Sequence, residues 1–356
     1  MSKKKLTYQA AGVDIDLYEQ SLAGMIPFIK RTHTPRVMDG FGGFASLFSL
    51  DCNLRLFAKN YRHPVLVTCN DGVGTKLKVA ILMNRHDTVG IDLVAMSVND
   101  CLCTGGEPLM FLDYLALPKD DPPLIRDLIK GISDGCIAAE CALVGGETAI
   151  LPDFYQSGDF DMAGFCVGVV EREHIIDGRS IQVGDVVLGL ASTGLHSNGY
   201  SLARKIVFEH AGLQVSDHVP ELGKTVGEEL LTPTRIYVKP IHKVLAHYPI
   251  KKHVIRGLAH ITGEGLPGNV PRVLPAGKRV FLKRGSWPIP PVFTWLQKLG
   301  DVEQGEMDKV FNNGIGFVMI VSRFYADSIQ RQLQDEGVPT FMIGEVRAGE
   351  ADVEWY

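Results

Sequence analysis

The stretch 68–80, TCNDGVGTKLKVA, places an aspartate and two glycines between an apolar run and two lysines. The run that ends in VLVTC predicts a buried strand over 65–69, and the residues after the glycines predict a helix over 76–84. Glycines followed by Thr75 and Lys76 are typical of a loop that binds phosphate, yet Asp71 adds a negative charge at its start. A divalent cation between carboxylate and phosphate would remove that conflict.

The bulk composition restricts the classes of protein. With 356 residues the chain fits two domains, and 46% hydrophobic with 22% charged residues is ordinary for a soluble globular protein. The net charge is −5 and the sequence has no stripe of basic residues, so it shows no electrostatic sign of nucleic-acid binding. We expect no membrane span, because no apolar segment reaches roughly 20 residues, and the start MSKKK lacks the apolar run of a secretory signal.

Seven cysteines occur, an odd number, and none stands at zinc-ligand spacing. Several lie in apolar runs, which predicts buried reduced thiols and a cytoplasmic protein. A metal or redox role for the Cys101–Cys103 pair is the less favoured interpretation.

Helical and strand periodicities alternate in both halves of the chain, which predicts two mixed α/β domains. A capping-box spacing at Asp16 and Glu19 starts a predicted helix over 17–30. ALVGGETAILP predicts a short strand that runs into a Gly-Gly turn. The further predicted elements of the first half are a helix over 90–105, a strand over 108–117, a helix over 123–141 and a strand over 163–173. The composition becomes polar and turn-rich over 173–185, so we expect domains at 1–172 and 173–356.

Acidic residues in apolar surroundings are the main chemical signal. Asp92 and Asn99 share one face of the predicted helix over 90–105, with Asp100 at its edge, and Glu147 directly follows two glycines. Carboxylates in such places are costly unless they are paired or coordinated, and few basic residues lie nearby in sequence. Together with Asp71 they indicate a Mg²⁺ site, although a turn former, a helix cap or a surface acid explains each residue alone.

Two nucleotide-binding motifs are absent. The only Gly-Lys-Thr, at 223–225, has His218 where a P-loop needs glycine. The GxGxxG at 263–268 is followed by no acid between Gly265 and Gly300, which excludes the usual dinucleotide site. HSN at 196–198 precedes a predicted helix, whose free N–H groups would suit an anion, but ordinary helix capping by Ser197 or Asn198 is the favoured interpretation from the residues alone.

The motifs in their order closely resemble those of the phosphoribosylformylglycinamidine cyclo-ligase family, the AIR synthetases of purine biosynthesis. The resemblance spans nearly the whole chain, and its most specific motifs are AGVDID (11–16), HSNGYSL (196–202) and TPTRIYVK (232–239). The other matching motifs are GFGGFAS (40–46), DGVGTK (71–76), GIDLVAMSVND (90–100), FLDYLA (111–116), LVGGETA (143–149), AGFCVGVVE (163–171) and EMDKVFNNGIG (306–316). TGEGLPGN departs from the family pattern at Glu264 and Pro267.

This resemblance implies an AIR-synthetase-like fold and a homodimer whose N-terminal sheets join in a barrel. It implies ATP- and Mg²⁺-dependent closure of formylglycinamidine ribonucleotide to aminoimidazole ribonucleotide, with release of ADP and phosphate. The implied metal ligands are Asp71, Asp92, Asp100 and Glu147, and the implied catalytic residues are Lys76 and His196. The implied ATP-binding residues are Lys30, Gly40, Gly42, Gly43, Gly72, Gly74, Thr75, Lys76 and Asn99, and the substrate-binding residues are His196, Ser197, Asn198 and Gly199.

Related families share the aspartate–glycine and Asn-Asp elements. A thiamine-monophosphate kinase would use the same ATP site for phosphoryl transfer to another phosphate. A hydrogenase maturation factor would be a carrier and scaffold, and it is expected to end in cysteine, whereas this sequence ends in VEWY.

Overall fold

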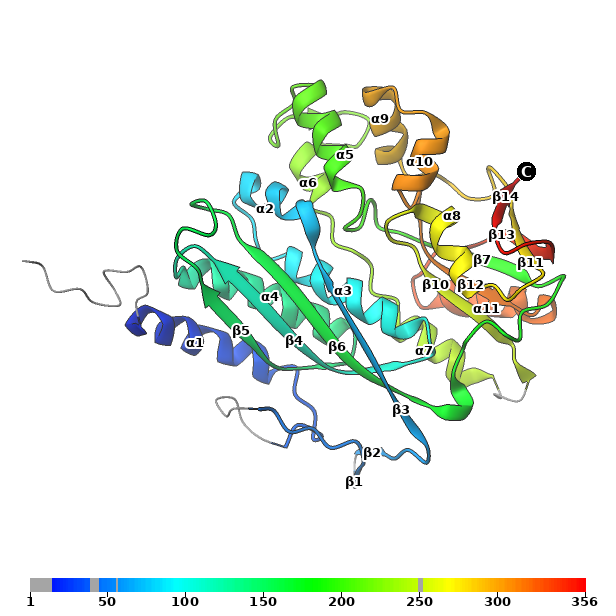
Figure 1. Ribbon diagram of the computed structural model, residues 1–356, viewed down its shortest axis with the longest axis horizontal. Helices are drawn as coiled ribbons and strands as arrows, with labels where there is room; N and C mark the ends of the chain where they lie inside the picture. The colour runs from blue at the N-terminus through cyan, green and yellow to red at the C-terminus, as the bar shows by residue number, and fades with distance from the viewer. Residues whose placement is uncertain (1–14, 39–44, 56, 249–251) are drawn as a thin grey trace, which may run out of the picture.

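The computed structural model describes residues 15–38, 45–55, 57–248 and 252–356. Its first sheet has the strand order β3-β6-β4-β5, in which only the β4–β5 pair is parallel. The strands are β3 (Pro64–Gly72), β4 (Glu107–Leu117), β5 (Ala142–Ile150) and β6 (Asp161–Glu171). Helices α3 (Val89–Leu102) and α4 (Pro122–Ala138) lie on one face of this sheet, and α1 (Ile15–Lys30) packs beside α4 and β5 (Figure 1).

Helix α3 lies at the centre of the molecule. It packs against the first sheet and α4 on one side and against β10 (Ile255–His260) and α7 (Val238–His247) of the second domain on the other. A Cβ on Gly90 would lie 2.3 Å from the backbone nitrogen of Ile132, so glycine lets α3 and α4 approach closely. Because other elements surround α3 on all sides, the helix is apolar around most of its circumference.

The predicted Gly-Gly turn is wrong, because β5 continues through Gly145 and Gly146 to Ile150. A Cβ on Gly146 would lie 2.4 Å from Oδ1 of Asp113 on the neighbouring strand. These glycines therefore permit close cross-strand packing rather than a change of chain direction.

The second sheet has the order β10-β12-β7-β13-β11-β14. Its remaining strands are β7 (Val186–Ala191), β11 (Lys278–Leu282), β12 (Ile315–Val321), β13 (Thr340–Ala348) and β14 (Val353–Trp355). Helices α7 and α11 (Ala326–Asp335) pack on one face through an apolar cluster that also includes Leu102 of α3. A second cluster on the other face includes residues of α8 (Gly265–Asn269) and η6 (Val270–Val273).

A helical layer connects the two sheets near the end of β3 (Figure 1). It contains η2 (Gly74–Lys76), α2 (Leu77–Met83), α5 (Tyr200–Arg204), η4 (Lys205–His210), α6 (Val226–Leu230), α9 (Pro291–Gly300) and α10 (Gln304–Val310). The small remaining elements are β1 (Cys52–Leu54), β2 (Phe57–Lys59), η3 (Arg172–His174), β8 (His218–Val219), β9 (Lys224–Thr225) and η7 (Arg323–Tyr325). The apolar core of this layer is continuous with that of the first sheet, so the two domains share packing.

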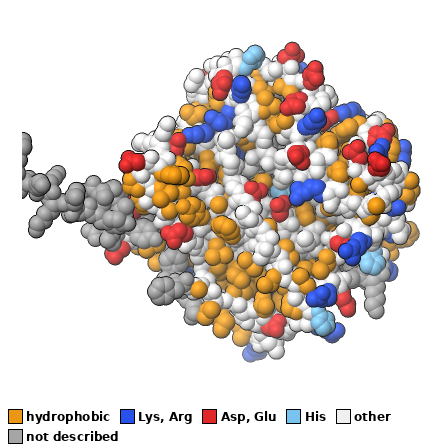
Figure 2. All heavy atoms as spheres, viewed as in Figure 1, with side chains coloured by type: hydrophobic (Ala, Val, Ile, Leu, Met, Phe, Trp, Pro, Cys, Tyr) orange, Lys and Arg blue, Asp and Glu red, His pale blue; other side chains and the backbone are white. Residues whose placement is uncertain are grey.

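The other face of the first sheet carries exposed apolar side chains. Leu66 on β3 is 60% exposed and Phe165 on β6 is 43% exposed, whereas their strand neighbours Val67 and Cys166 face α3. Figure 2 shows hydrophobic side chains gathered over this sheet. Among the described residues, no layer of structure covers this apolar sheet face.

The expectation of two mixed α/β domains is confirmed, whereas the barrel formed by two sheets and the boundary at 172/173 remain predictions. The last strand of the first sheet ends at Glu171, and the first strand of the second begins at Val186. Among the described residues, no helix combines the length and apolar character needed to cross a membrane.

Candidate active site

Lys76 and Asp92 form a fully buried ion pair where the two domains meet. Lys76 follows the glycine loop after β3 and Asp92 lies in the first turn of α3, with Nζ and Oδ1 2.9 Å apart. Nζ also donates to the carbonyl oxygens of His196 at 2.9 Å and Thr232 at 2.7 Å. Oδ1 of Asp92 accepts from the backbone nitrogen of Thr234 at 2.7 Å and from its hydroxyl at 2.6 Å.

This arrangement favours structural roles for Lys76 and Asp92, whose catalytic, ATP-binding and metal-binding roles remain predictions. The three protons of the Lys76 ammonium meet three acceptors, so none is left for a phosphate. Asp92 neutralises that ammonium and is shielded from solvent, which argues against the predicted metal ligation. Burial lowers the pKa of Lys76, and the Asp92 carboxylate acts in the opposite direction.

Asn99 also joins the domains and has no free group for ATP. Its side-chain nitrogen donates to the carbonyl oxygen of Arg235 at 2.9 Å, and its oxygen accepts from the backbone nitrogen of Tyr237 at 3.0 Å. The side chain is fully buried. Asn99 therefore holds segment 232–237 against α3, and its ATP contact remains a prediction.

Asp71 and Asp100 lie close enough to interact electrostatically. Burial raises the pKa of Asp71, and the Asp100 carboxylate raises it further, while a hydrogen bond from the Gly72 backbone opposes both. Asp100 accepts at Oδ1 from Nδ1 of His260, 2.9 Å away at the end of β10, and its side chain is 44% exposed. Asp100 and His260 thus pair across the domain boundary, and Asp71 is near enough to Asp100 for their charges to interact.

Glu147 does not join this group within one protomer. Asp71, Gly164, Asp113 and Gly146 lie at one level across the four strands, which places β3 and β5 about 14 Å apart. Glu147 is the next residue on β5, so it points to the opposite, uncovered face of the sheet. The predicted gathering of four acids is therefore absent from the protomer, and the described residues contain no cluster of three or more His, Cys, Asp or Glu suited to a metal.

The loop after β3 meets the start of α5. Gly74 has φ of +72°, a conformation that suits glycine, and the exposed Thr75 hydroxyl lies 3.3 Å from that of Ser201. Asn198 contacts the sulfur of Met96 on α3, and Ser197 lies 3.4 Å from the Thr234 hydroxyl. These contacts bring Thr75 and the 197–201 segment to the same domain boundary as Asp71 and Asp100.

Other predicted residues are less informative. Gly72 ends β3, and Gly199 precedes α5 with φ of +76°. Lys30 is exposed at the end of α1, next to β5 and on the side of the sheet away from β3. Gly40, Gly42 and Gly43 lie outside the described residues.

His196 is buried inside the second domain, which argues against the predicted catalytic role. Its Nε2 accepts from the backbone nitrogens of Thr193 at 3.2 Å and Arg235 at 3.5 Å, and the residue is 1% exposed. Burial holds the pKa of His196 well below its ordinary value, with smaller contributions from His260 and Lys76. A ring enclosed in this way braces the 193–196 turn against segment 232–237.

A pocket of about 340 Å³ adjoins Asp100 and His260. Its wall also includes Cys103, which directly follows α3, and two residues of the second domain, Asn269 and Arg272. Arg272 donates to Oδ1 of Asn269 at 3.2 Å, and within the described part of the chain no carboxylate lies within ion-pair distance of it. The pocket therefore places the Arg272 cation in one wall with the acids Asp100 and Asp177, at a size suited to a small ligand.

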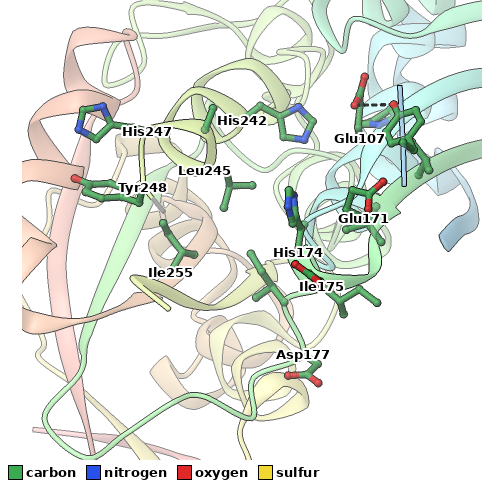
Figure 3. A pocket seen from close by; sticks show the side chains of 18 of the residues that line it. Glu107, Glu171, His174, Ile175, Asp177, His242, Leu245, His247, Tyr248 and Ile255 are labelled. Carbon is green, nitrogen blue, oxygen red and sulfur yellow. Dashed lines mark hydrogen bonds between the residues drawn. The ribbon is translucent and has the colours of Figure 1, made fainter. Parts of the chain in front are cut away.

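A larger pocket, of about 1180 Å³, lies elsewhere on the domain boundary (Figure 3). His174, His242 and Glu107 are among its lining residues, and Glu171 marks the end of β6. Glu171 is seven residues along β6 from Gly164, the partner of Asp71, or about 23 Å away. The larger pocket shares Ile176 and Asp177 with the smaller one, so the two pockets adjoin, although Glu171 itself lies far from Asp71.

Three contacts of segment 232–237 were not predicted from the sequence. Thr232 binds Lys76, Thr234 binds Asp92 and Arg235 binds Asn99. Their segment, TPTRIYVK, was visible only as a motif, because its backbone groups supply most of the contacts. The pairing of His260 with Asp100 depends on tertiary structure, so no local pattern predicts it.

Comparison with known families gives two matches that cover most of the chain. The family model described as "AIR synthase related protein, N-terminal domain" matches residues 58–170. The corresponding C-terminal domain model matches residues 182–355.

Curated relatives match along nearly their whole length. The phosphoribosylformylglycinamidine cyclo-ligase of Citrifermentans bemidjiense is 52% identical over 354 residues, which cover 99% of each chain. The enzyme of the same name from Caldanaerobacter subterraneus is 48% identical over 348 residues, covering 98% of this chain and 99% of the relative.

Solved structures share the fold at low identity. A thiamine-monophosphate kinase from Stenotrophomonas maltophilia has a TM-score of 0.66 and 16% identity, with 93% of this chain and 95% of the kinase covered. The hydrogenase maturation protein HypE in complex with ATP has a TM-score of 0.59 and 14% identity, with 92% and 89% covered. These likenesses show the fold alone.

Proposed function

The chain belongs to the phosphoribosylformylglycinamidine cyclo-ligase family, and from that membership we propose how its residues carry out the family's reaction. It is an ATP-dependent cyclo-ligase of purine biosynthesis, which converts formylglycinamidine ribonucleotide to aminoimidazole ribonucleotide. This assignment rests on the cyclo-ligase relatives, which are identical to the chain at about half of its positions along nearly its full length. The kinase and HypE, by contrast, share less than a fifth of their residues with the chain.

The chemistry requires activation of a poor leaving group. The formyl oxygen of the substrate attacks the γ-phosphorus of ATP, and the bond to ADP breaks. The amidine nitrogen then attacks the activated carbon, the C–O bond breaks with release of phosphate, and loss of a proton leaves the aromatic imidazole. Protein groups that place the two substrates in line supply most of the rate, because little covalent chemistry is left to the enzyme.

Asp71 and Asp100 fit a magnesium ion that accompanies ATP. They are hard oxygen donors, their charges are near enough to interact, and Asp100 is partly exposed to the domain boundary. Mg²⁺ is commonly bound through one or two carboxylates, with phosphate oxygens and waters completing its coordination, so two acids suffice. When bound, the ion neutralises phosphate charge; His260 holds the Asp100 carboxylate in place from the second domain.

ATP would lie over the loop 72–76, where Gly72 and Gly74 allow a close backbone approach and Thr75 offers a hydroxyl. Substrate would occupy the 340 Å³ pocket, with its anionic phosphate at Arg272 and with Ser197, Asn198 and Gly199 near the adjoining boundary. Lys30 and the loop at 40–43 remain proposed contacts of the nucleotide.

We assign a homodimer in which the uncovered faces of two first sheets meet. Leu66 and Phe165 supply apolar side chains for such a contact, and pairing two copies would shield them from water. Seven cysteines, all free, favour a reducing compartment, so we place the enzyme in the cytoplasm.

Product analysis tests this function. Purified protein is incubated with ATP, Mg²⁺ and formylglycinamidine ribonucleotide, and the aminoimidazole product and ADP are quantified. We expect both in equal amounts, and no ADP without the ribonucleotide. ATP consumption that depends on thiamine monophosphate instead would identify a kinase and overturn the assignment.

A further inference from the structure

Three thiols from three separate elements lie near one another behind the candidate site. Cys69 on β3 is paired in register with Cys166 on β6, and Cys101 on α3 is near enough to both for the side chains to interact. Cys69 Sγ also lies 3.0 Å from the carbonyl oxygen of Ser97 on α3. The cluster therefore connects the first sheet to the helix that carries Asp100.

The strand register makes Cys69 and Cys166 direct neighbours. They are paired residues of the antiparallel strands β3 and β6, so both side chains point to the α3 face. Opposed residues in such a pair have Cα atoms roughly 4.5–5.5 Å apart. This spacing falls within the roughly 4.4–6.8 Å that a disulfide spans, so the bond could form with little backbone movement.

Access differs among the three thiols. Cys101 and Cys166 are buried, whereas Cys69 is only partly buried. Because Cys69 faces α3, the proposed dimer contact on the opposite face of the sheet would not cover it. Metal binding is not favoured, because the described residues contain no metal-suited cluster of three or more ligands.

We propose that Cys69 and Cys166 form an oxidation site that converts peroxide to water and becomes a disulfide. The sulfur of Cys69 attacks one peroxide oxygen, the O–O bond breaks, and Cys69 becomes a sulfenic acid with release of one water. The sulfur of Cys166 then attacks that of Cys69, the S–O bond breaks, and a second water leaves. Two thiols are oxidised and one hydrogen peroxide is reduced, and a dithiol reverses the step.

The disulfide would act on the candidate site through position. Cys69 is two residues before Asp71, and Cys101 directly follows Asp100. Turning the sulfur of Cys69 toward Cys166 removes its contact with Ser97, so β3 and α3 lose one of the contacts that set their spacing. Small displacements of positioning groups lower rates steeply.

The experiment treats the reduced full-length protein with graded hydrogen peroxide, blocks the remaining thiols and maps disulfides by mass spectrometry. We expect a peptide that links Cys69 to Cys166 and an intact mass lower by two hydrogens. We also expect a loss of about 10-fold or more in aminoimidazole formation that dithiothreitol restores. The activity readout rests on the proposed function, whereas the mass readout does not, so the two can fail separately.

Variants complete the test. Cys166→Ala should abolish the linked peptide and the reversible loss of activity, and Cys69→Ser should do the same. Cys52→Ser, at a partly buried thiol outside the cluster, should leave both unchanged. A link from Cys69 to Cys101, or an equal reversible loss in the Cys166→Ala protein, would overturn the proposal.

Discussion

Lys76 Nζ and Asp92 Oδ1 lie 2.9 Å apart with neither side chain exposed, and their remaining hydrogen bonds reach the second domain at His196, Thr232 and Thr234. Lys76 and Asp92, which the sequence predicted to contact ATP and metal, thus fasten the two domains together. The pair fixes the position of the glycine loop relative to segment 232–237.

Removing one partner of this pair should destabilise the protein strongly. Lys76→Met or Asp92→Asn leaves a buried group uncompensated, and we expect a loss of about 3–5 kcal/mol in the free energy of unfolding. Urea unfolding measures this loss in the free energy of unfolding. Lys78→Met, which breaks the partly exposed Lys78–Asp159 pair, is the control and should cost less than about 1 kcal/mol. Equal urea midpoints for the Asp92→Asn and Lys78→Met proteins would contradict the structural role.

His196 should make stability depend on pH. Burial lowers its pKa below the ordinary value of 6.5, so below that pH the unfolded chain binds a proton that the folded protein does not. The unfolding free energy should therefore fall as pH drops from about 7 to 5, by up to about 1.4 kcal/mol per pH unit from this residue.

His196→Asn tests this, because asparagine tolerates the φ of +63° at this position. Urea midpoints at pH 7 and pH 5 should differ less for this variant than for the parent protein. His247→Asn, at an exposed histidine, should keep the parent's difference. A parent-like difference in the His196→Asn protein would show that His196 does not carry the effect.

The uncovered sheet face should hold two copies together. By light scattering, we expect the parent protein to have twice the chain's mass of 39.0 kDa. Leu66→Glu or Phe165→Glu should lower the measured mass toward that of one chain, because a buried unpaired charge in the interface is costly. Phe324→Glu changes an 86% exposed phenylalanine on the second domain and should leave the mass unchanged. A monomeric parent protein would rule out this interface.

Arg272 should determine affinity for the ribonucleotide. A lost charge-assisted contact to phosphate costs about 1.5–3 kcal/mol, so Arg272→Met should raise the KM for formylglycinamidine ribonucleotide by roughly 10- to 100-fold. The KM for ATP should stay near the parent value. Arg279→Met, which removes a surface partner of Glu354, serves as the matched control. A rise in the KM for ATP alone would place Arg272 in the nucleotide site instead.

Local periodicity predicted much of the first domain. The helices at 17–30 and 90–105 and the strand at 108–117 correspond to α1, α3 and β4 within a few residues. The Gly-Gly turn failed because the glycines serve Asp113 on a neighbouring strand, which no local pattern reveals. Helical spacing also placed Asp92 and Asn99 on one face of α3 correctly, and their partners there are backbone groups from segment 232–237.

Metal ligands were harder to predict than elements. Two acids, Asp71 and Asp100, come together because β3 ends beside α3, whereas Glu147 follows a strand at the far edge and faces the other side. Asp71 and Glu147 both lie next to glycines in the sequence. The order of the strands in the sheet nevertheless decides which of these side chains lie near one another. Strand order is a tertiary property that the spacing of residues along the chain does not contain.

The most direct test of the account measures aminoimidazole ribonucleotide formation against Mg²⁺ concentration in the Asp71→Asn and Asp100→Asn proteins. Both substitutions keep the shape of the side chain and remove its charge. We predict that kcat falls by roughly 100-fold or more and that half-maximal activity requires more Mg²⁺, while Asp127→Asn on the surface of α4 matches the parent. Parent-like kcat and Mg²⁺ dependence in both proteins would contradict the claim that these two carboxylates hold the metal that ATP requires.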